Sequence, residues 1–174
     1  MADGGEQAVG FRLWPPVAIF GPLLVGWLVG SAWGEPVSLG SWRMPVGWAL
    51  VVLFAGWNGW SLWLFARHRT GLLPGQPTRT LIESGPYRVS RNPLYVGMLL
   101  LYLGVALLVP TFWGLVLFPV AVLLVFWGAI RPEERFLHER LGAPYDEYRR
   151  RVPRWLGPVR RRAVPGVAPC RPDV

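Results

Sequence analysis

Two polar segments of the chain contain the residues whose types and spacing are suited to chemistry. The first covers residues 85–95 and reads GPYRVSRNPLY, and the second covers residues 131–153 and includes Glu133 and Glu134. Between them, residues 94–130 contain no charged side chain. Tyrosine hydroxyls and carboxylates can form hydrogen bonds with the ribose or ammonium groups of a ligand, and these bonds are strong when one partner is charged. The pattern therefore predicts an enzyme-like polar site built from both sides of an apolar hairpin.

The first polar segment predicts a helix that begins at Asn92-Pro93. Asn is a favoured N-cap, Pro is favoured at the first helical position, and a residue before Pro avoids helical angles. Such a start leaves backbone N–H groups free at a positive dipole end, which suits a carboxylate or phosphate. Tyr87 precedes this start and Tyr95 lies one turn inside it, so both rings can line one opening. A membrane-entry turn with interfacial tyrosines is the alternative interpretation.

The second polar segment also allows two interpretations. Pro132 is expected to begin a helix, and acids such as Glu133 and Glu134 in a first turn are stabilised by roughly 0.3 to 1 kcal/mol through the dipole. Their position directly after an apolar segment, beside Arg131 and Arg135, favours a second role in binding ribose hydroxyls or an ammonium group. An apolar stripe broken at residues 142–144 predicts two short helices along the membrane interface.

The elements that must position these segments are membrane helices. Apolar residues make up 52% of the 174 residues, which include 11 tryptophans, and this composition is typical of an integral membrane protein. Residues 13–33 and 44–66 are each long enough to span a bilayer, which takes about 20 residues. Residues 94–130 predict two helices joined by a tight turn near Val109-Pro110-Thr111. The expected fold is an all-α polytopic membrane bundle of about four helices, the last two a hairpin, with short cytosolic C-terminal helices.

The arginines predict the orientation and the organisation of the chain. They concentrate in residues 67–91 and after residue 130, and basic loops stay on the cytoplasmic side. Both termini are therefore expected in the cytoplasm, at the inner membrane of a bacterium. The predicted parts are a cytosolic N-terminus (1–12), two membrane helices with a basic loop (13–78), a cofactor-binding region with the hairpin (79–157) and a disordered basic tail (158–174).

Charge and metal-ligand content narrow the range of partners. The net charge of +8 is explained by this orientation together with attraction to anionic headgroups, so the bilayer is the expected partner and nucleic acid is not. The single Cys170 excludes an intramolecular disulfide. Neither His68 nor His138 has a second ligand at metal-binding spacing, and no metal site is expected. The oligomeric state is left open.

The order of these motifs resembles a family, the membrane methyltransferases that include isoprenylcysteine carboxyl methyltransferase and the phospholipid N-methyltransferases. The resemblance covers approximately residues 79–153. It depends on the GPY and RNPLY elements, the hairpin, the Glu-Glu pair, and a Gly-x-x-Tyr-x-x-Tyr element followed by Val-Pro. It implies a small helical bundle whose cytosolic loops enclose S-adenosylmethionine, with a lipophilic or lipidated acceptor that enters from the bilayer.

The resemblance also implies site residues. Those expected to contact the cofactor are Leu81, Ile82, Tyr87, Asn92, Pro93, Leu94, Tyr95 and Glu133. Arg131 is similar in place to an arginine that binds the acceptor, and Glu134 is grouped with it as a catalytic candidate. Asn92 stands where the eukaryotic carboxyl methyltransferases have histidine, which excludes a titratable ring at this position.

The implied activity is transfer of a methyl group to a carboxyl, thiol or amine of a lipophilic acceptor. Two alternatives come from other classes. A non-catalytic membrane partner would keep the bundle without binding cofactor. A membrane reductase similar to sterol reductases would bind a nicotinamide cofactor, although the chain has no Gly-x-Gly-x-x-Gly element.

Overall fold

A computed structural model describes residues 14–68 and 82–159 of the chain, and these residues form helices and no strands. This confirms the all-α class. The elements are α1 (Pro15–Trp33), α2 (Arg43–His68), η1 (Gly85–Arg88), α3 (Pro93–Leu108), α4 (Phe112–Val116), α5 (Phe118–Val125), η2 (Phe126–Ile130), α6 (Arg131–Leu141) and α7 (Ala143–Arg151). The predicted cytosolic N-terminus, the basic tail, Cys170 and Leu81 lie outside the described residues.

Helices α1 and α2 are the elements of the described part that are long and apolar enough to cross a membrane. Helix α3 is also apolar but has only 16 residues. The predicted fourth span is interrupted, because α4 ends at Val116 and α5 begins at Phe118, with Pro119 in its first turn. A proline lacks the backbone donor of a continuous helix, which accounts for a break here. That α3 and α4–α5 also cross the bilayer stays a prediction.

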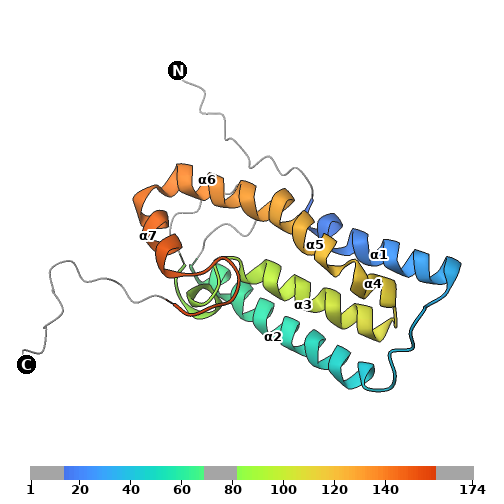
Figure 1. Cartoon of the computed structure of the whole chain (residues 1–174). Coiled ribbons are helices and arrows are strands. Elements are labelled where there is room, and N and C mark those ends of the chain that lie inside the picture. Colours follow the sequence, from blue (N-terminus) through green and yellow to red (C-terminus); the bar gives the residue numbers. More distant parts are fainter. Residues whose placement is uncertain (1–13, 69–81, 160–174) are drawn as a thin grey trace, which may run out of the picture.

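The helices lie side by side in the order α1, α4–α5, α3 and α2 (Figure 1). The chain reverses direction between α3 and α4, at the turn predicted around Val109-Pro110-Thr111. The Thr111 hydroxyl accepts a hydrogen bond from Gly114 N–H at 3.0 Å and so caps α4. This reversal brings η1, the start of α3, and α6 to one end of the bundle, here the polar end. The opposite end, with the α1–α2 and α3–α4 connections, is the turn end.

Small residues allow the helices to approach closely. A Cβ atom on Gly26 of α1 would collide with the backbone of Gly114 in α4. Next to this contact, the buried Tyr102 hydroxyl donates to the Gly114 carbonyl at 2.7 Å. Glycine at helix crossings is common in membrane bundles, where close packing takes the place of a hydrophobic driving force. These contacts fix the position of α4–α5 between α1 and α3.

Helix α6 is the continuation of α5 and does not begin at a free end. The π-helix η2 joins them, Ile130 before α6 is itself helical, and the Arg131 N–H bonds to the Phe126 carbonyl five residues earlier. Pro132 within a straight α-helix would clash with the carbonyl four residues before it, and a wider π turn relieves this clash. Pro132 and the first-turn acids Glu133 and Glu134 therefore lie at a helix start as predicted, but this helix continues directly from η2 and does not follow a loop.

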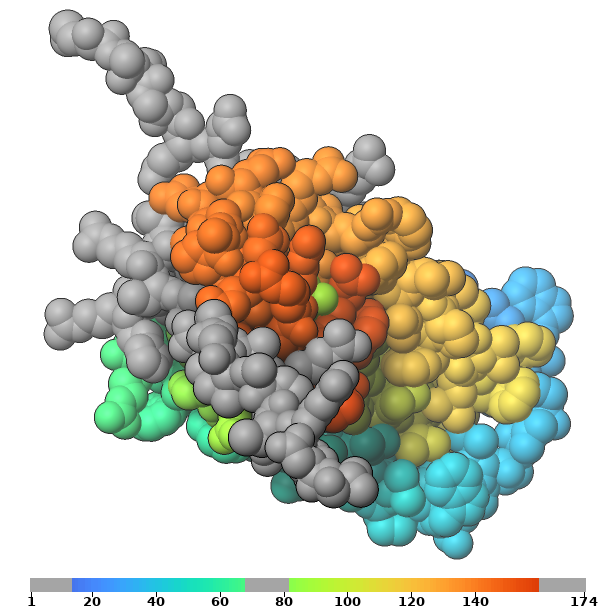
Figure 2. All heavy atoms as spheres, turned by 60° about the vertical axis from the view of Figure 1, so that its left-hand side comes forward, coloured from blue at the N-terminus to red at the C-terminus, as the bar shows by residue number. Residues whose placement is uncertain are grey.

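The predicted pair of short helices after residue 130 is confirmed. Helix α6 ends at Gly142, whose φ of 58° lies in the left-handed region that glycine tolerates. Helix α7 then folds back toward the bundle. In Figure 2, α6, α7 and the segment that follows them, in orange to red, are exposed on the face that is turned forward.

Candidate functional site

The η1 segment places Tyr87 at the polar end. Gly85 opens the segment with a φ of 58°, and a Cβ atom there would also meet Leu64 of α2 at 2.8 Å. The Tyr87 ring is buried against Ile82 and Leu64 and makes an edge contact with Phe65 at 5.4 Å between centroids. Glycine at this position thus lets the segment pack on the end of α2 with the Tyr87 ring turned inward.

Glu133 and Tyr95 meet across the polar end. The Tyr95 hydroxyl, one turn into α3, donates to Glu133 Oε2 on α6 at 2.9 Å. Burial, opposed by this hydrogen bond and supported by the neighbouring Glu134, raises the pKa of Glu133. Two residues that the sequence placed 38 positions apart are therefore in direct contact.

The Tyr87 hydroxyl is a further polar group at the same end of the bundle. It is buried and has no hydrogen-bond partner among the described residues. Burial, followed by the charge of nearby Glu133, raises the pKa of Tyr87, so the phenol stays neutral and able to donate. We call Tyr87, Tyr95 and Glu133 the Glu133 site. A buried polar atom without a partner costs free energy, which a bound polar ligand would recover.

Glu134 is used differently from its neighbour. Its buried carboxylate accepts hydrogen bonds from Arg154 Nε at 3.0 Å and from Arg154 Nη2 at 2.8 Å. It also forms an ion pair with Arg91 Nη1 at 3.1 Å, and the side chains of Arg91 and Glu134 are 9% and 10% exposed. The hydrogen bond with Glu134 raises the pKa of Arg154. We call these three residues the Glu134 network. Its geometry is that of a structural tie.

The segment after α7 is fastened across the loop between η1 and α3. The Arg91 N–H donates to the Pro153 carbonyl at 3.0 Å. The Arg154 carbonyl accepts from the Asn92 side-chain amide at 3.2 Å and from the Ser90 hydroxyl at 3.4 Å. Asn92 occupies the predicted N-cap position of α3, but its side chain makes no cap hydrogen bond. The amide is instead held by the backbone of this segment.

Helix α7 holds the same loop from a second side. The buried Tyr148 hydroxyl donates to the Tyr87 carbonyl at 2.7 Å. Tyr145 packs beside Tyr148, and burial raises the pKa of Tyr145 to about 12. The Gly-x-x-Tyr-x-x-Tyr element thus holds the backbone of Tyr87, a residue of the Glu133 site, through a hydrogen bond from α7.

The remaining residues predicted to contact a cofactor have structural partners. Ile82 is buried against Tyr87 and Leu64. The carbonyl of Pro93 accepts from the Trp57 indole at 2.8 Å, and that of Leu94 accepts from the Asn58 amide at 3.4 Å. These bonds from α2 fix the start of α3.

Arg131 lies apart from the Glu133 site. Its side chain is exposed, and its guanidinium stacks over the Trp127 ring at 4.2 Å from the centroid. Trp127 is itself 56% exposed, so this stack lies on the outer surface of the η2–α6 helix. An interfacial position suits such a pair, since both side chains are amphipathic. A role for Arg131 in acceptor binding stays a prediction.

Sequence reasoning did not single out Arg154, Arg91 or Ser90 as residues of the site. Arg91 lies within the GPYRVSRNPLY segment, and Arg154 directly follows the Val-Pro element. The position of these arginines within or directly after the motifs was the feature of the sequence that could have identified them. Residue type alone does not distinguish these arginines from the many others in a strongly basic chain.

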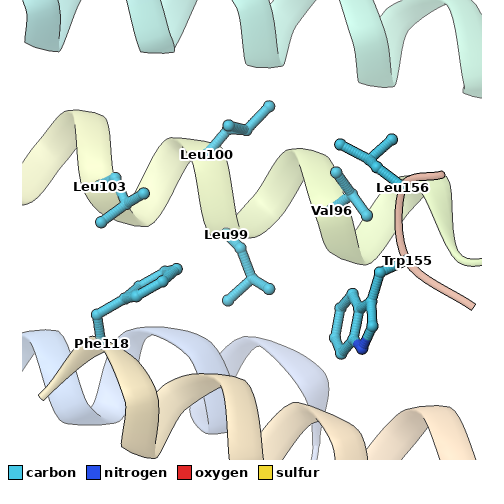
Figure 3. A pocket seen from close by; sticks show the side chains of 7 residues that line it. All are labelled: Val96, Leu99, Leu100, Leu103, Phe118, Trp155 and Leu156. Atoms are coloured by element: carbon cyan, nitrogen blue, oxygen red, sulfur yellow. The ribbon is translucent and has the colours of Figure 1, made fainter.

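An apolar groove of about 290 Å³ lies between α3 and α5, beside the segment that follows α7 (Figure 3). Its lining consists of Val96, Leu99, Leu100, Leu103, Phe118, Trp155 and Leu156. Val96 lies in the first turn of α3, and Trp155 packs against the core cluster that contains Tyr95, so the groove begins at the polar end of the bundle. It follows α3 to Leu103, a rise of about 10 Å at 1.5 Å per residue. A ligand with a polar group at the Glu133 site and an apolar chain in this groove matches the arrangement.

Metal-ligand geometry is not a feature of the described part of the chain. Within residues 14–68 and 82–159, no three His, Cys, Asp or Glu side chains gather as a metal site would require. His138 instead lies 3.0 Å from Asp146 and joins α6 to α7.

The chain is similar to several known proteins. Cobalt-zinc-cadmium resistance protein CzcN of Cupriavidus metallidurans is 31% identical over 133 residues, which cover 66% of this chain and 61% of that protein. Nickel-cobalt-cadmium resistance protein NccN of Alcaligenes xylosoxydans xylosoxydans is 26% identical over 133 residues, with 66% and 62% covered. The chain thus spans about three fifths of the length of both relatives.

A methyltransferase is also among the relatives. Protein-S-isoprenylcysteine O-methyltransferase of Schizosaccharomyces pombe is 34% identical over 73 residues, which cover 42% of this chain and 31% of that enzyme. No solved structure gives a significant match. A family model described as phospholipid methyltransferase matches residues 42–143, which is more than half of the 174 residues and includes α2, α3 and the Glu133 site. The chain belongs to the phospholipid methyltransferase family.

Proposed function

We propose that the protein is a membrane methyltransferase that uses S-adenosylmethionine to methylate a carboxyl, thiol or amine group of a lipophilic acceptor. Family membership and the similarity to an isoprenylcysteine O-methyltransferase support the reaction class. The observation that carries the proposal is the Glu133 site at the head of an apolar groove. There a partly buried carboxylate and a buried phenol, which has no partner among the described residues, lie at the end of the bundle where an apolar groove suited to a hydrocarbon chain begins.

The residues present fit the proposed cofactor. S-adenosylmethionine supplies a methyl group made electrophilic by a positive sulfonium, together with ribose hydroxyls and an ammonium group. The Glu133 carboxylate can accept hydrogen bonds from such hydroxyl or ammonium groups, and the Tyr87 hydroxyl can donate to an acceptor atom. Tyr95 holds the Glu133 carboxylate in place through its 2.9 Å hydrogen bond. The protein would contribute orientation and exclusion of water, while the cofactor carries the chemistry.

The acceptor is proposed to place its apolar part between α3 and α5. Val96, Leu99 and Leu103 would contact the chain along one face of α3. An anionic acceptor would need a cation near its reacting group, and Arg131 or Arg88 could supply it. Both are exposed at the polar end, outside the Glu133 site. A carboxylate or thiol needs less help from a base than an amine does, and is the favoured acceptor.

We propose that the fold crosses the bilayer four times, with α3 and α4–α5 as the third and fourth spans. Both termini and the polar end would then face the cytoplasm of a bacterium, in line with the positive-inside distribution of arginine. The exposed tryptophans of α1 and α2, such as Trp33 and Trp48, suit contact with lipid and its interface.

A cofactor titration tests this function. Purified protein in detergent is titrated with S-adenosylmethionine, beside Glu133→Ala and a control variant, Glu139→Ala, whose side chain is exposed on the same helix. We expect saturable binding by the wild type and by Glu139→Ala, and a loss of at least about tenfold in affinity for Glu133→Ala, as for a charged hydrogen bond worth about 1.5 to 3 kcal/mol.

Other outcomes favour the alternatives. Binding of a nicotinamide cofactor in place of S-adenosylmethionine would indicate the reductase. Binding of neither by folded wild-type protein would indicate a non-catalytic membrane partner. Equal binding by the wild type and Glu133→Ala would remove Glu133 from the site.

A further inference from the structure

Residues 152–156 connect the two halves of the candidate site, and we call them the strap. They follow α7 and lie outside the part of the chain matched by the family model, residues 42–143. Their backbone carbonyls bind the loop that leads into α3, and their side chains reach both the Glu134 network and the apolar groove. A substitution in the strap is therefore expected to affect both the Glu134 network and the apolar groove.

Arg154 fixes the position of the strap relative to α6 and to the start of α3. Its guanidinium meets Glu134 through two nitrogens, at 3.0 Å and 2.8 Å, and also stacks over the Phe126 ring at 5.0 Å. The fork of an arginine fits a carboxylate in one orientation, which a lysine cannot reproduce. Its carbonyl is held from the other side by Asn92 and Ser90. The main chain at Arg154 is thus fixed to α6 and to the start of α3 together.

Trp155 and Leu156 stand at the polar-end entrance of the groove. Figure 3 shows them on either side of Val96, with the Trp155 ring directed toward the ribbon of the opposite helix and Phe118 at the far end. Trp155 is partly buried and packs against the core cluster that contains Tyr95. The width of the groove next to the Glu133 site therefore depends on where the Trp155 ring lies.

We propose that Trp155 determines which apolar chains the groove accepts, and that Arg154 is a positioning residue that holds Trp155 in place through Glu134. This inference rests on the proposed function, since it takes the occupant of the groove to be the hydrocarbon part of the acceptor. The reason is continuity. A chain that enters the groove from the polar end and extends along α3 first passes Val96, Trp155 and Leu156. The Trp155 indole at this entrance would leave less room for a chain that carries methyl branches than for a straight chain.

The test measures occupancy of the groove by lipid. Full-length protein in phosphatidylcholine nanodiscs is photolabelled with two diazirine lipids, one with a straight palmitoyl chain and one with a phytanoyl chain of equal main-chain length that bears methyl branches. Peptides that contain residues 96–103 and 155–156 are quantified by mass spectrometry. In the wild type we expect the palmitoyl probe to label these peptides more than the phytanoyl probe does.

The substitution Trp155→Ala should raise the phytanoyl-to-palmitoyl labelling ratio in the groove by about tenfold, the lower range for one methyl-sized difference in an apolar pocket. The control is Trp48→Ala, an exposed tryptophan on α2 that is remote from the groove and should leave the ratio unchanged. An unchanged ratio in Trp155→Ala would overturn the specificity role. Equal labelling of the groove and of the exposed Val52 and Leu53 on α2 would overturn the groove itself as a binding place.

A second pair of variants tests the positioning role. Arg154→Ala should change the labelling ratio in the same direction as Trp155→Ala and speed amide hydrogen exchange at Arg91, whose N–H binds the strap. Arg154→Lys, which keeps the charge but loses the fork, should fall between Arg154→Ala and the wild type. Wild-type labelling and exchange in a folded Arg154→Ala would overturn the positioning role. If Arg154→Ala does not fold, Arg154→Lys alone decides.

These measurements do not involve the cofactor, so the proposed function and the proposed role of Trp155 can each be contradicted without the other. Wild-type protein that shows the expected labelling but binds no S-adenosylmethionine would contradict the proposed function and leave the groove and strap as a lipid site. Protein that binds S-adenosylmethionine but shows no preferred labelling would contradict this inference alone.

Discussion

The two ends of the helix bundle use charged side chains in different ways. At the turn end, Glu35 accepts a hydrogen bond from Phe112 N–H at 2.8 Å, which satisfies a free donor at the start of α4. There too, the Arg43 guanidinium donates to the carbonyls of Leu107 at 3.3 Å and Leu108 at 3.1 Å, at the end of α3. At the polar end, Glu133 is partly buried with a raised pKa, and the Tyr87 hydroxyl has no partner among the described residues.

This difference separates charged side chains that complete helix ends from polar side chains that keep unused hydrogen-bonding capacity among the described residues. Glu35 and Arg43 neutralise helix ends, a role that needs nothing further. The same contrast occurs inside the polar end between two consecutive residues. Glu134 is paired with two arginines, whereas Glu133 is bonded to a tyrosine hydroxyl and, within the described part of the chain, forms no ion pair. Residue type alone is therefore a poor guide to function in this protein, and the partners of each group decide it.

The largest effect is expected for Glu134→Ala. Removal of one partner leaves Arg91, whose side chain is 9% exposed, as a buried charge without its counter-ion. Breaking a buried pair in this way costs about 3 to 5 kcal/mol. Unfolding in a detergent titration should shift accordingly, while Glu139→Ala on the exposed face of α6 should stay close to wild type. A wild-type unfolding midpoint for Glu134→Ala would show that the network does not support the fold.

The contact between α1 and α4 gives the next largest effect. Gly26→Ala would place a Cβ atom against the backbone of Gly114, and such overpacking costs about 1 to 3 kcal/mol. The matched control is Gly21→Ala on the same helix, where the added Cβ atom meets no neighbour. The control should be neutral or slightly stabilising, because alanine favours helix more than glycine does. Equal stability of both variants in thermal unfolding would contradict the close packing.

The turn end should influence stability without influencing the cofactor. Glu35→Ala removes the acceptor for Phe112 N–H, and the loss of such a cap costs about 1 kcal/mol. S-adenosylmethionine affinity should be unchanged, since the Glu133 site lies at the opposite end of the helices. A fall in cofactor affinity equal to that of Glu133→Ala would mean that the two ends are not independent. Isothermal titration and thermal unfolding on the same sample make the comparison.

The smallest expected change in stability has the opposite sign and comes from Glu133→Gln. Burial raises the pKa of Glu133, so the folded state holds this proton more tightly than the unfolded state. The stabilising contribution is then fully present below the ordinary glutamate pKa and is lost as the pH rises through the raised value. The variant should be slightly more stable than wild type at alkaline pH, and the difference should disappear in acid. A constant difference across the pH range would contradict a raised pKa.

Much of the fold was predictable, because a long run of apolar residues within one segment is enough to indicate a membrane helix. The apolar runs gave α1 and α2, Asn92-Pro93 gave the start of α3, and the Val109-Pro110-Thr111 turn gave the reversal. The sequence did not indicate that the helix start at Pro132 continues directly from the π-helix η2, and this has a physical reason. Proline is as compatible with the wide turn of a π-helix as with a helix start, and only the preceding residues decide which is formed.

The candidate site was less predictable, although its residues were named in part. Tyr87, Tyr95 and Glu133 were grouped from their motifs, and the structure brings Tyr95 and Glu133 together. Glu134 was grouped with Arg131, but it meets Arg91 and Arg154, and Arg131 stacks outward on Trp127. Successive residues of a helix point about 100° apart, so adjacent positions in the sequence face different surroundings.

The sequence by itself determined the helices, their apolar character, the end of the bundle at which the polar segments meet, and the family. These depend on residue patterns within about one helix length and on short motifs in a fixed order. Only the tertiary structure decided which carboxylate is tied to arginines and which is bonded to a tyrosine, and that residues 152–156 lie across both the α3 start and the groove. Such roles are set by partners 20 to 64 residues away in the chain, and chain separation leaves no local pattern to read.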